Sequence, residues 1–277
     1  MSSDQPVLTK PQKKSWRQTF RDSPIGHGPL RGIVETVVLI VVAVCLALIV
    51  KTFFVQAFYI PSSSMEPGLQ VNDRILVEKP SYWFGGTPQR GDIIVFSDPG
   101  NWLGAEDDAP PASGLGKLMA KIGLYPTGGH LVKRVIGVAG DTVVCCTTSG
   151  QISVNGKALN ESSFVRRDGY SCDGPMRQNG GSSSGGGCSG WKAVVPAGRL
   201  FVMGDNRGNS ADSSYHLCSP AREKRARTDP RLAATCLNAF VPTSDVVGKV
   251  AALVWPAGRF KLLHRPGTFN GIPAAKG

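Results

Sequence analysis

Two short stretches contain side chains that can together perform covalent chemistry. The first is Pro61-Ser-Ser-Ser-Met-Glu-Pro67, in which three consecutive hydroxyls follow a proline. A serine hydroxyl is a weak nucleophile and needs a neighbouring base to remove its proton. The second is the apolar, strand-like run His130-Leu-Val-Lys-Arg-Val-Ile-Gly-Val138, which contains Lys133. Burial in such a run lowers the pKa of a lysine amine, and the neutral amine that results can act as a base.

Each stretch by itself has a simpler interpretation. A serine run after proline is typical of a turn or linker, and a lysine in a strand usually projects into solvent. Histidine is the more common partner of a nucleophilic serine, and His130, His216 and His264 follow the serine run. A Ser–His hydrolase that uses His130 or His216 is therefore an alternative to a serine–lysine pair.

The elements that must position these side chains are mainly strands. Alternating or β-branched apolar residues predict strands at residues 56–60, 71–78, 92–97, 131–139, 142–145, 192–195, 199–203 and 246–255. Gly140-Asp141 and Asn155-Gly156 predict hairpin turns. We expect a mostly β domain over residues 56–265, with insertions at about 98–129, 172–191 and 217–238, and a C-terminal tail over residues 266–277.

One segment is apolar enough to cross a bilayer. It runs from Ile33 to Val50 and continues to Val55 if Lys51 snorkels, which gives roughly 20 residues. Six Lys and Arg residues against two acidic residues within residues 1–32 predict a cytoplasmic N-terminal tail and a catalytic domain outside the membrane. A cleaved signal peptide is the alternative, although the apolar run exceeds the usual 7–15 residues.

The charge of the chain also bears on its partners. The formal net charge is +11, but no helical stripe interleaves Lys and Arg with aromatic residues. We therefore expect no nucleic-acid partner and interpret the basic tail as a segment attracted to anionic lipid. A plain disordered polar tail remains an alternative for the same residues.

Six of the seven cysteines follow the apolar segment, on the side where disulfides persist. Six cysteines allow 15 pairings. Cys172 with Cys188 and Cys218 with Cys236 would each close a local loop, which leaves the neighbours Cys145 and Cys146. No C-x-x-C or H-x(3–5)-H spacing supports a metal site, so we expect none.

Four segments occur in a characteristic combination and order. They are Pro61–Pro67, Arg90–Phe96, Lys133–Asp141 and Gly204–Ser213. With this combination the sequence resembles the bacterial type I signal peptidases, the membrane-anchored serine–lysine proteases that remove signal peptides. The resemblance extends from about Phe58 to Val250 and is interrupted by the insertions.

The resemblance implies a role for each of four residues. Ser64 corresponds to the nucleophile and Lys133 to the general base. Ser62 corresponds to the hydroxyl that donates to the oxyanion hole together with the backbone N–H of Ser64. Ser210 corresponds to the serine that orients the lysine amine. The resemblance implies no metal or organic cofactor.

It also implies a structural shell, from which the sequence departs. Asp205 and Arg134 correspond to a supporting ion pair, and Asp212 to a second structural carboxylate. The family's Asp-Ser-Arg ending is Asp212-Ser-Ser214 here, and Gly208 replaces a common aspartate. Three residues are candidates for the missing positive charge: His216, Arg207 and Arg222.

Substrate binding is implied for the segment before the nucleophile, Phe58–Ser63, as an edge strand that pairs with an extended substrate. We expect Phe58, Ile60, Pro61 and Ser63 to contact substrate. Candidate walls of the shallow pockets for small side chains are Phe58, Ile60, Val71 and Val135. Aromatic residues that can rest on lipid are Phe53, Phe54, Tyr82, Trp83 and Phe84.

The sequence thus predicts a single-pass enzyme of the plasma membrane that cleaves exported preproteins, close to the secretion translocon. An anchored, non-catalytic binding or scaffold protein that keeps this fold is the alternative from another class. The departure at Ser214 is the reason to retain it.

Overall fold

The computed structural model describes residues 29–50, 54–83, 85–100, 102–103, 129–169, 171–174 and 190–275 of the 277-residue chain. Its contacts divide the chain into two units, Met1–Ile49 and Val50–Gly277. Most of the basic tail and of the insertions expected at 98–129 and 172–191 lies outside the described residues, as do Phe53 and Phe84.

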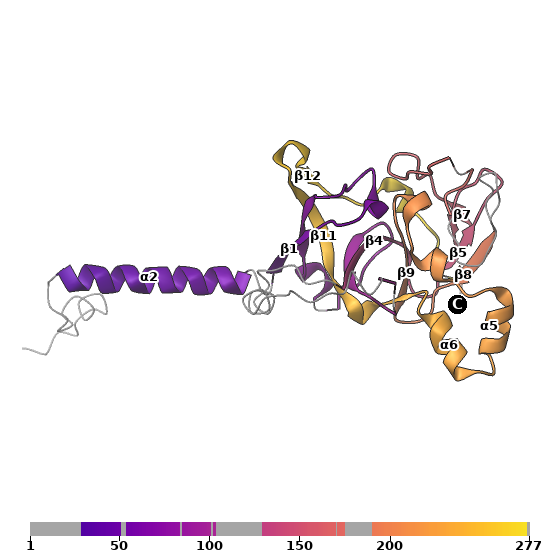
Figure 1. Cartoon of the computed structure of the whole chain (residues 1–277), viewed down its shortest axis with the longest axis horizontal. Helices are drawn as coiled ribbons and strands as arrows, with labels where there is room; N and C mark the ends of the chain where they lie inside the picture. The colour runs from indigo at the N-terminus through magenta and orange to yellow at the C-terminus, as the bar shows by residue number, and fades with distance from the viewer. Residues whose placement is uncertain are drawn as a thin grey trace, which may run out of the picture. The chain divides into compact units, whose positions relative to one another are not determined.

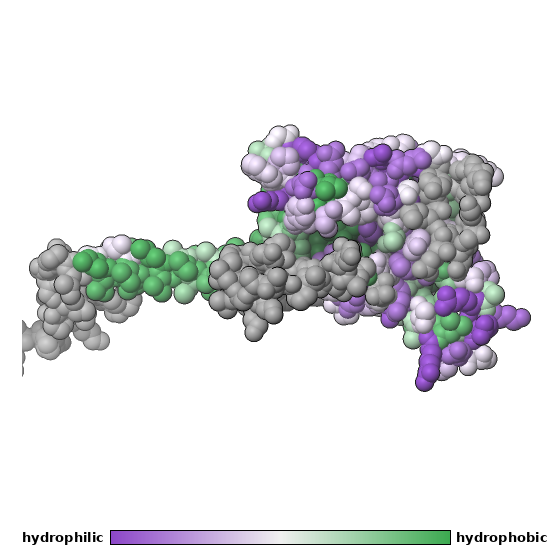
Figure 2. Space-filling view, in the orientation of Figure 1, coloured by the Kyte–Doolittle hydropathy of each residue, from purple (hydrophilic) through white to green (hydrophobic). Residues whose placement is uncertain are grey.

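The first unit contains the helix α2, Pro29–Ile49. Its segment Gly32–Ile49 has a mean hydropathy of 2.9, and among the described residues it is the one helix long and apolar enough to cross a membrane. Eighteen residues of α-helix extend for about 27 Å, close to the thickness of a bilayer core. Its apolar side chains are exposed, and Figure 2 shows the apolar surface that they form along the helix.

The second unit is built on two antiparallel sheets (Figure 1), and the mostly β fold is confirmed. The larger sheet has the order β1-β2-β11-β3-β4-β9-β10, and β12 pairs with β11. Its strands are β1 Val55–Tyr59, β2 Arg74–Glu78, β3 Ile93–Ser97, β4 His130–Gly137, β9 Arg199–Met203, β10 Val241–Pro242, β11 Val246–Trp255 and β12 Lys261–Leu262.

The smaller sheet has the order β7-β6-β5-β8 and follows the central strand β4 in the chain. Its strands are β5 Thr142–Cys145, β6 Ser153–Val154, β7 Lys157–Ala158 and β8 Trp191–Val194. The turn between β6 and β7 contains Asn155 at a φ of 51° and Gly156 at 84°, the left-handed pair that an Asn-Gly hairpin turn requires.

The apolar alternation of the strands produces the core. In β2, for example, Ile75 and Val77 are fully buried while Arg74 is exposed. The core extends past residue 265, because Phe269 and Ile272 are buried in the cluster around the smaller sheet. Residues 266–275 therefore pack against the domain, although the sequence suggested a tail that begins at residue 266.

The insertion at 217–238 contains two helices, where the sequence suggested irregular structure. They are α5 Pro220–Ala226 and α6 Pro230–Leu237, which follow the short helix α4 Ser213–His216. Ser219 and Asp229 cap the two helices, and each is followed by proline in the first helical turn. A disulfide between Cys218 and Cys236, with Cα atoms 5.4 Å apart, closes the pair of helices at its base.

The remaining cysteines of this unit lie together. Cys145 and Cys146 form a disulfide with each other, and Cys172 is also disulfide-bonded. Its expected partner, Cys188, lies outside the described residues. The sulfur atoms of Cys145, Cys146 and Cys172 lie within 4.8 Å of one another.

Candidate active site

The serine run forms a tight turn directly after β1. Ser63–Met65 is a short 3-10 helix, and the side chains of Ser64 and Met65 are buried. The backbone N–H of Asn206 donates to the carbonyl oxygen of Ser64 at 3.0 Å, which ties the turn to the distant Gly204–Ser213 segment. The backbone at Ser64 is therefore held by the fold, as a linker would not be.

Lys133 lies on β4, between β3 and β9 in the larger sheet. Its Nζ donates a hydrogen bond of 2.6 Å to Ser64 Oγ. Lys133 is 4% exposed and Ser64 is 7% exposed, so this contact is shielded from water. Burial lowers the pKa of Lys133 from its usual 10.5 to about 8, although Asp212 and Asp205 act in the opposite direction. Near pH 8 the amine is thus neutral in a large fraction of molecules and can accept a proton.

Ser62 lies on the solvent-exposed side of the contact between Lys133 and Ser64. Its Oγ lies 3.2 Å from Ser64 Oγ, and the residue is exposed. A hydroxyl at this place can rotate to donate to a negatively charged oxygen formed beside Ser64.

Ser210, in contrast to Ser62, is buried. Its Oγ donates to Asp212 Oδ2 at 2.7 Å. The same carboxylate accepts from Gly204 N at 2.9 Å and from both the backbone N and the Oγ of Ser214, at 3.0 and 2.7 Å. Ser214, which stands in place of the family's arginine, therefore supplies two neutral donors to Asp212.

The three candidates for the missing positive charge differ in their surroundings. Burial lowers the pKa of His216 and outweighs the carboxylate of Asp212, which lies close enough to favour the charged form of His216. Arg207 forms a buried ion pair with Glu161. The ring of His216 stacks on Trp102 with centroids 4.7 Å apart. Arg222 is exposed on α5.

Arg134, the next residue of β4, forms a two-bond ion pair with Asp205. Its Nε and Nη2 donate to the carboxylate at 2.8 and 2.7 Å, and its Nη1 donates to the carbonyl of Gly91 at 2.9 Å. The guanidinium carbon also lies 4.4 Å from the ring centroid of Phe164. The predicted pairing of Arg134 with Asp205 is therefore present in the fold.

A groove of about 340 Å³ leads to the serine–lysine contact. It lies between the end of β1, with Phe58, Ile60 and Pro61, and the start of β4, with residues 129–133. β1 is the outermost strand in the order of the larger sheet, so an extended peptide can pair with its outer edge.

The remaining predicted substrate contacts do not line this groove. Ser63 instead accepts from Asn206 Nδ2 at its carbonyl and from Asn209 Nδ2 at its hydroxyl, at 3.1 and 2.7 Å. Val71 lies outside the groove and is 41% exposed, and Val135 is fully buried in a core cluster. Neither Asn206 nor Asn209 was predicted to have a role, although both lie in the Gly204–Ser213 segment.

The histidine alternatives are less well placed. His130 lines the groove, with its ring 5.5 Å from that of Phe58. His216 is held against Trp102. The hydroxyl of Ser64 contacts Lys133 and Ser62, so the geometry favours the serine–lysine pair.

Comparison with known proteins shows the family of the chain. Residues 33–255 match the family described as signal peptidase, peptidase S26. Signal peptidase I of Mycobacterium tuberculosis (strain ATCC 25618 / H37Rv) is 38% identical over 260 residues, which cover 89% of this chain and 80% of that protein. Signal peptidase I of Leptolyngbya laminosa is 32% identical over 268 residues, covering 96% and 98%. A crystal structure of a signal peptidase I from Enterococcus faecalis V583 aligns at 22% identity with a TM-score of 0.30, covering 59% of this chain and 96% of that one. The chain therefore belongs to the signal peptidase family, peptidase S26.

Proposed function

We propose that the chain cleaves N-terminal signal peptides from exported preproteins, with Ser64 as nucleophile and Lys133 as general base. The observation that carries this proposal is the 2.6 Å contact between the buried Lys133 amine and Ser64 Oγ. The family assignment makes the chain a serine endopeptidase, and this contact gives the reaction its nucleophile and its base.

The reaction then proceeds in two steps. The neutral amine of Lys133 accepts the Ser64 proton as Oγ attacks the scissile carbonyl carbon. The resulting ammonium donates that proton to the departing amine of the mature protein, which leaves an ester between Ser64 and the signal peptide. Lys133 next removes a proton from water as the water oxygen attacks the ester carbonyl carbon. The bond from that carbon to Ser64 Oγ then breaks, the Lys133 ammonium returns its proton to Oγ, and the signal peptide leaves with a new terminal carboxyl group.

Three further sets of groups support these steps. Ser62 Oγ and the backbone N–H of Ser64 donate to the oxyanion of each tetrahedral intermediate. Ser210, held by Asp212, keeps the lysine amine oriented toward Ser64. Asp205 and Arg134 fix the loop that carries Ser210.

The substrate binds as a strand along the outer edge of β1. Phe58, Ile60 and Pro61 line the groove next to the serine–lysine contact, and its apolar walls suit small side chains before the cut. Phospholipid is the second partner, because the exposed apolar surface of α2 requires an apolar solvent. We place residues 1–32 in the cytoplasm and the catalytic unit outside, where a signal peptide leaves the bilayer near the translocon.

The test uses the full-length protein in detergent micelles and a preprotein with Ala-x-Ala before its cleavage site. Ser64→Ala and Lys133→Ala should each lower kcat/KM by about 10⁴-fold or more, as in other covalent proteases. His130→Ala and His216→Ala should retain most of the activity.

Two results would contradict the proposal. Loss of cleavage in a histidine variant together with activity in Lys133→Ala would support a Ser–His hydrolase. Failure of the unmodified protein to cleave any such preprotein would support a non-catalytic relative.

A further inference from the structure

A second buried ion pair lies behind the proposed active site. Arg207 Nη2 donates to Glu161 Oε1 at 2.8 Å, and Nη1 donates to Oε2 at 3.0 Å. Both side chains have no exposed surface. Glu161 follows β7 in the chain, 46 residues before Arg207, and no sequence motif connects the two.

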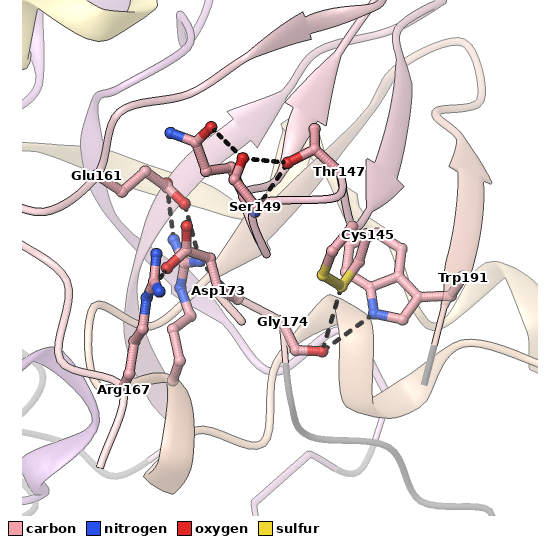
Figure 3. The surroundings of a disulfide bond; sticks show 11 residues. Cys145, Thr147, Ser149, Glu161, Arg167, Asp173, Gly174 and Trp191 are labelled. Carbon is pink, nitrogen blue, oxygen red and sulfur yellow. Dashed lines mark hydrogen bonds and ion pairs between the residues drawn. A yellow bond between two sulfur atoms is a disulfide. The ribbon is translucent and has the colours of Figure 1, made fainter. Parts of the chain in front are cut away.

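The guanidinium of Arg207 joins three segments of the chain. Besides Glu161, it donates from Nη1 to the carbonyl of Asp173 and from Nε to the carbonyl of Gly204 at 2.9 Å. Asp173 directly follows the disulfide-bonded Cys172. Figure 3 shows Glu161 and Asp173 near each other, with Gly174 leading from Asp173 toward the disulfide of Cys145. Arg207 thus ties the Gly204 turn to a disulfide-bonded part of the domain.

Gly204 is packed against the two serines of the site. A Cβ atom at this position would lie 2.5 Å from the carbonyl oxygen of Ser64 and 2.6 Å from the Cβ of Ser210. The backbone N–H of Gly204 donates to Asp212, and that of Asn206 donates to the carbonyl of Ser64. A shift of residues 204–206 would therefore move both Ser64 and Ser210 relative to Lys133.

Glu161 is the group that makes a fixed Arg207 possible. A guanidinium stays protonated in proteins, so in a site without water it needs a carboxylate partner. When one partner of such a pair is removed, the remaining charge is uncompensated and the local structure rearranges to solvate it. The carbonyl of Gly204 is one of the groups that this rearrangement would release.

From this chain of contacts we infer that Glu161 is a positioning residue for the reaction of Ser64, and that it acts through Arg207 on the turn at residues 204–206. The inference rests on the proposed function, since it concerns the same reaction. Neither Glu161 nor Arg207 lines the substrate groove. Loss of the pair should therefore lower kcat and leave KM unchanged.

The test compares two buried carboxylates in the full-length protein. Glu161→Gln should lower kcat by about 100-fold, the cost of a misplacement of about 1 Å at a reacting group, with KM unchanged. The matched control is Asp141→Asn, because Asp141 is also fully buried and accepts two bonds from one arginine, Arg90, at 2.6 and 2.5 Å. In Asp141→Asn the free energy of unfolding in urea should fall, while kcat should equal that of the unmodified protein.

A double variant separates positioning from stability. Apolar replacement of both partners, Glu161→Met with Arg207→Met, removes the buried charges and should recover much of the stability lost in Glu161→Gln. Its kcat should stay low, because no side chain then holds the Gly204 carbonyl.

The inference is wrong if the double variant regains full kcat, or if Glu161→Gln and Asp141→Asn have the same kcat. If Glu161→Gln does not fold, the double variant alone decides between these outcomes. The proposed function fails separately, if the unmodified protein does not cleave or if Lys133→Ala does.

Discussion

Lys133 and Arg134 are successive residues of β4, and each is 4% exposed. Their partners differ. The amine of Lys133 donates to a neutral hydroxyl, that of Ser64, whereas the guanidinium of Arg134 donates two bonds to the carboxylate of Asp205. Equal burial therefore has opposite consequences. A buried lysine amine beside a neutral hydroxyl can lose its proton and act as a base, whereas a guanidinium keeps its charge and, when buried, needs a carboxylate partner that ties the structure together.

The carboxylates near the two residues also act differently on them. Burial lowers the pKa of Lys133 even though Asp212 and Asp205 favour its charged form. Arg134 is bonded directly to Asp205 and so offsets part of that negative charge. Arg207 also has a buried carboxylate partner: burial acts to lower the pKa of Arg207, but Glu161 and other nearby carboxylates outweigh burial and raise it.

The largest effect is expected when position 133 is made like position 134. In Lys133→Arg the side chain keeps its positive charge, but a guanidinium does not release its proton at any usable pH. Cleavage of the preprotein should fall by about 10⁴-fold at pH 8 and should not recover at pH 10. Measurable activity that rises with pH in this variant would show that the proton of Ser64 goes to another group.

The next largest effect concerns the Arg134 pair. Asp205→Asn leaves a buried guanidinium without its carboxylate, so the free energy of unfolding in urea should fall by about 3–5 kcal/mol. Removing both charges with Arg134→Met and Asp205→Leu should recover part of that loss. A single variant as stable as the unmodified protein would mean that the pair is not a structural support.

Ser62→Ala tests the exposed end of the site. It removes one donor to the oxyanion and should lower kcat by about 100- to 1,000-fold. Because Ser62 is exposed, the urea midpoint should not change. An unchanged kcat would assign the oxyanion to other donors.

The smallest effect is on stability at position 133. Burying the ammonium costs about 3 kcal/mol for a pKa of about 8 against the usual 10.5, while the bond to Ser64 contributes about 1 kcal/mol. Lys133→Met should thus be more stable than the unmodified protein by about 2 kcal/mol at pH 7.

The size of this stability difference depends on pH. Between pH 8 and 10.5 the unfolded chain retains a proton that the folded protein has released, so the unmodified protein gains stability as pH rises. The advantage of Lys133→Met should shrink across this window in urea titrations. A difference that does not vary with pH would mean that the pKa of Lys133 is not lowered by folding.

The strands were predictable because each carries its own periodic pattern. The hairpin at Asn155-Gly156 and the long strand Val246–Trp255 follow from local sequence alone, and both are present. The ends of α5 and α6 had local signals as well, Ser219-Pro220 and Asp229-Pro230. These helices of 7 and 8 residues are too short for a clear apolar period, so the segment resembled a loop.

Some residues of the candidate site lie in distinctive sequence segments, whereas others are brought to the site only by folding. The sequence pointed to Ser64, Lys133, Ser210 and Asp205 because they lie in distinctive segments. It could not point to Glu161, which stands in an ordinary polar loop and meets Arg207 only through the packing of the smaller sheet. The neutral donors around Asp212 are local, within eight residues of it, but Ser214 matched no family pattern and so received no role.

The central claim is that folding makes the amine of Lys133 a weaker base than an ordinary lysine, next to Ser64. The most direct measurement is an NMR titration of the full-length protein with isotope-labelled lysine, in which the Lys133 signal is assigned by its absence from Lys133→Met. We predict a titration midpoint of about 8 for this amine. A midpoint at the usual 10.5 of lysine would contradict the account.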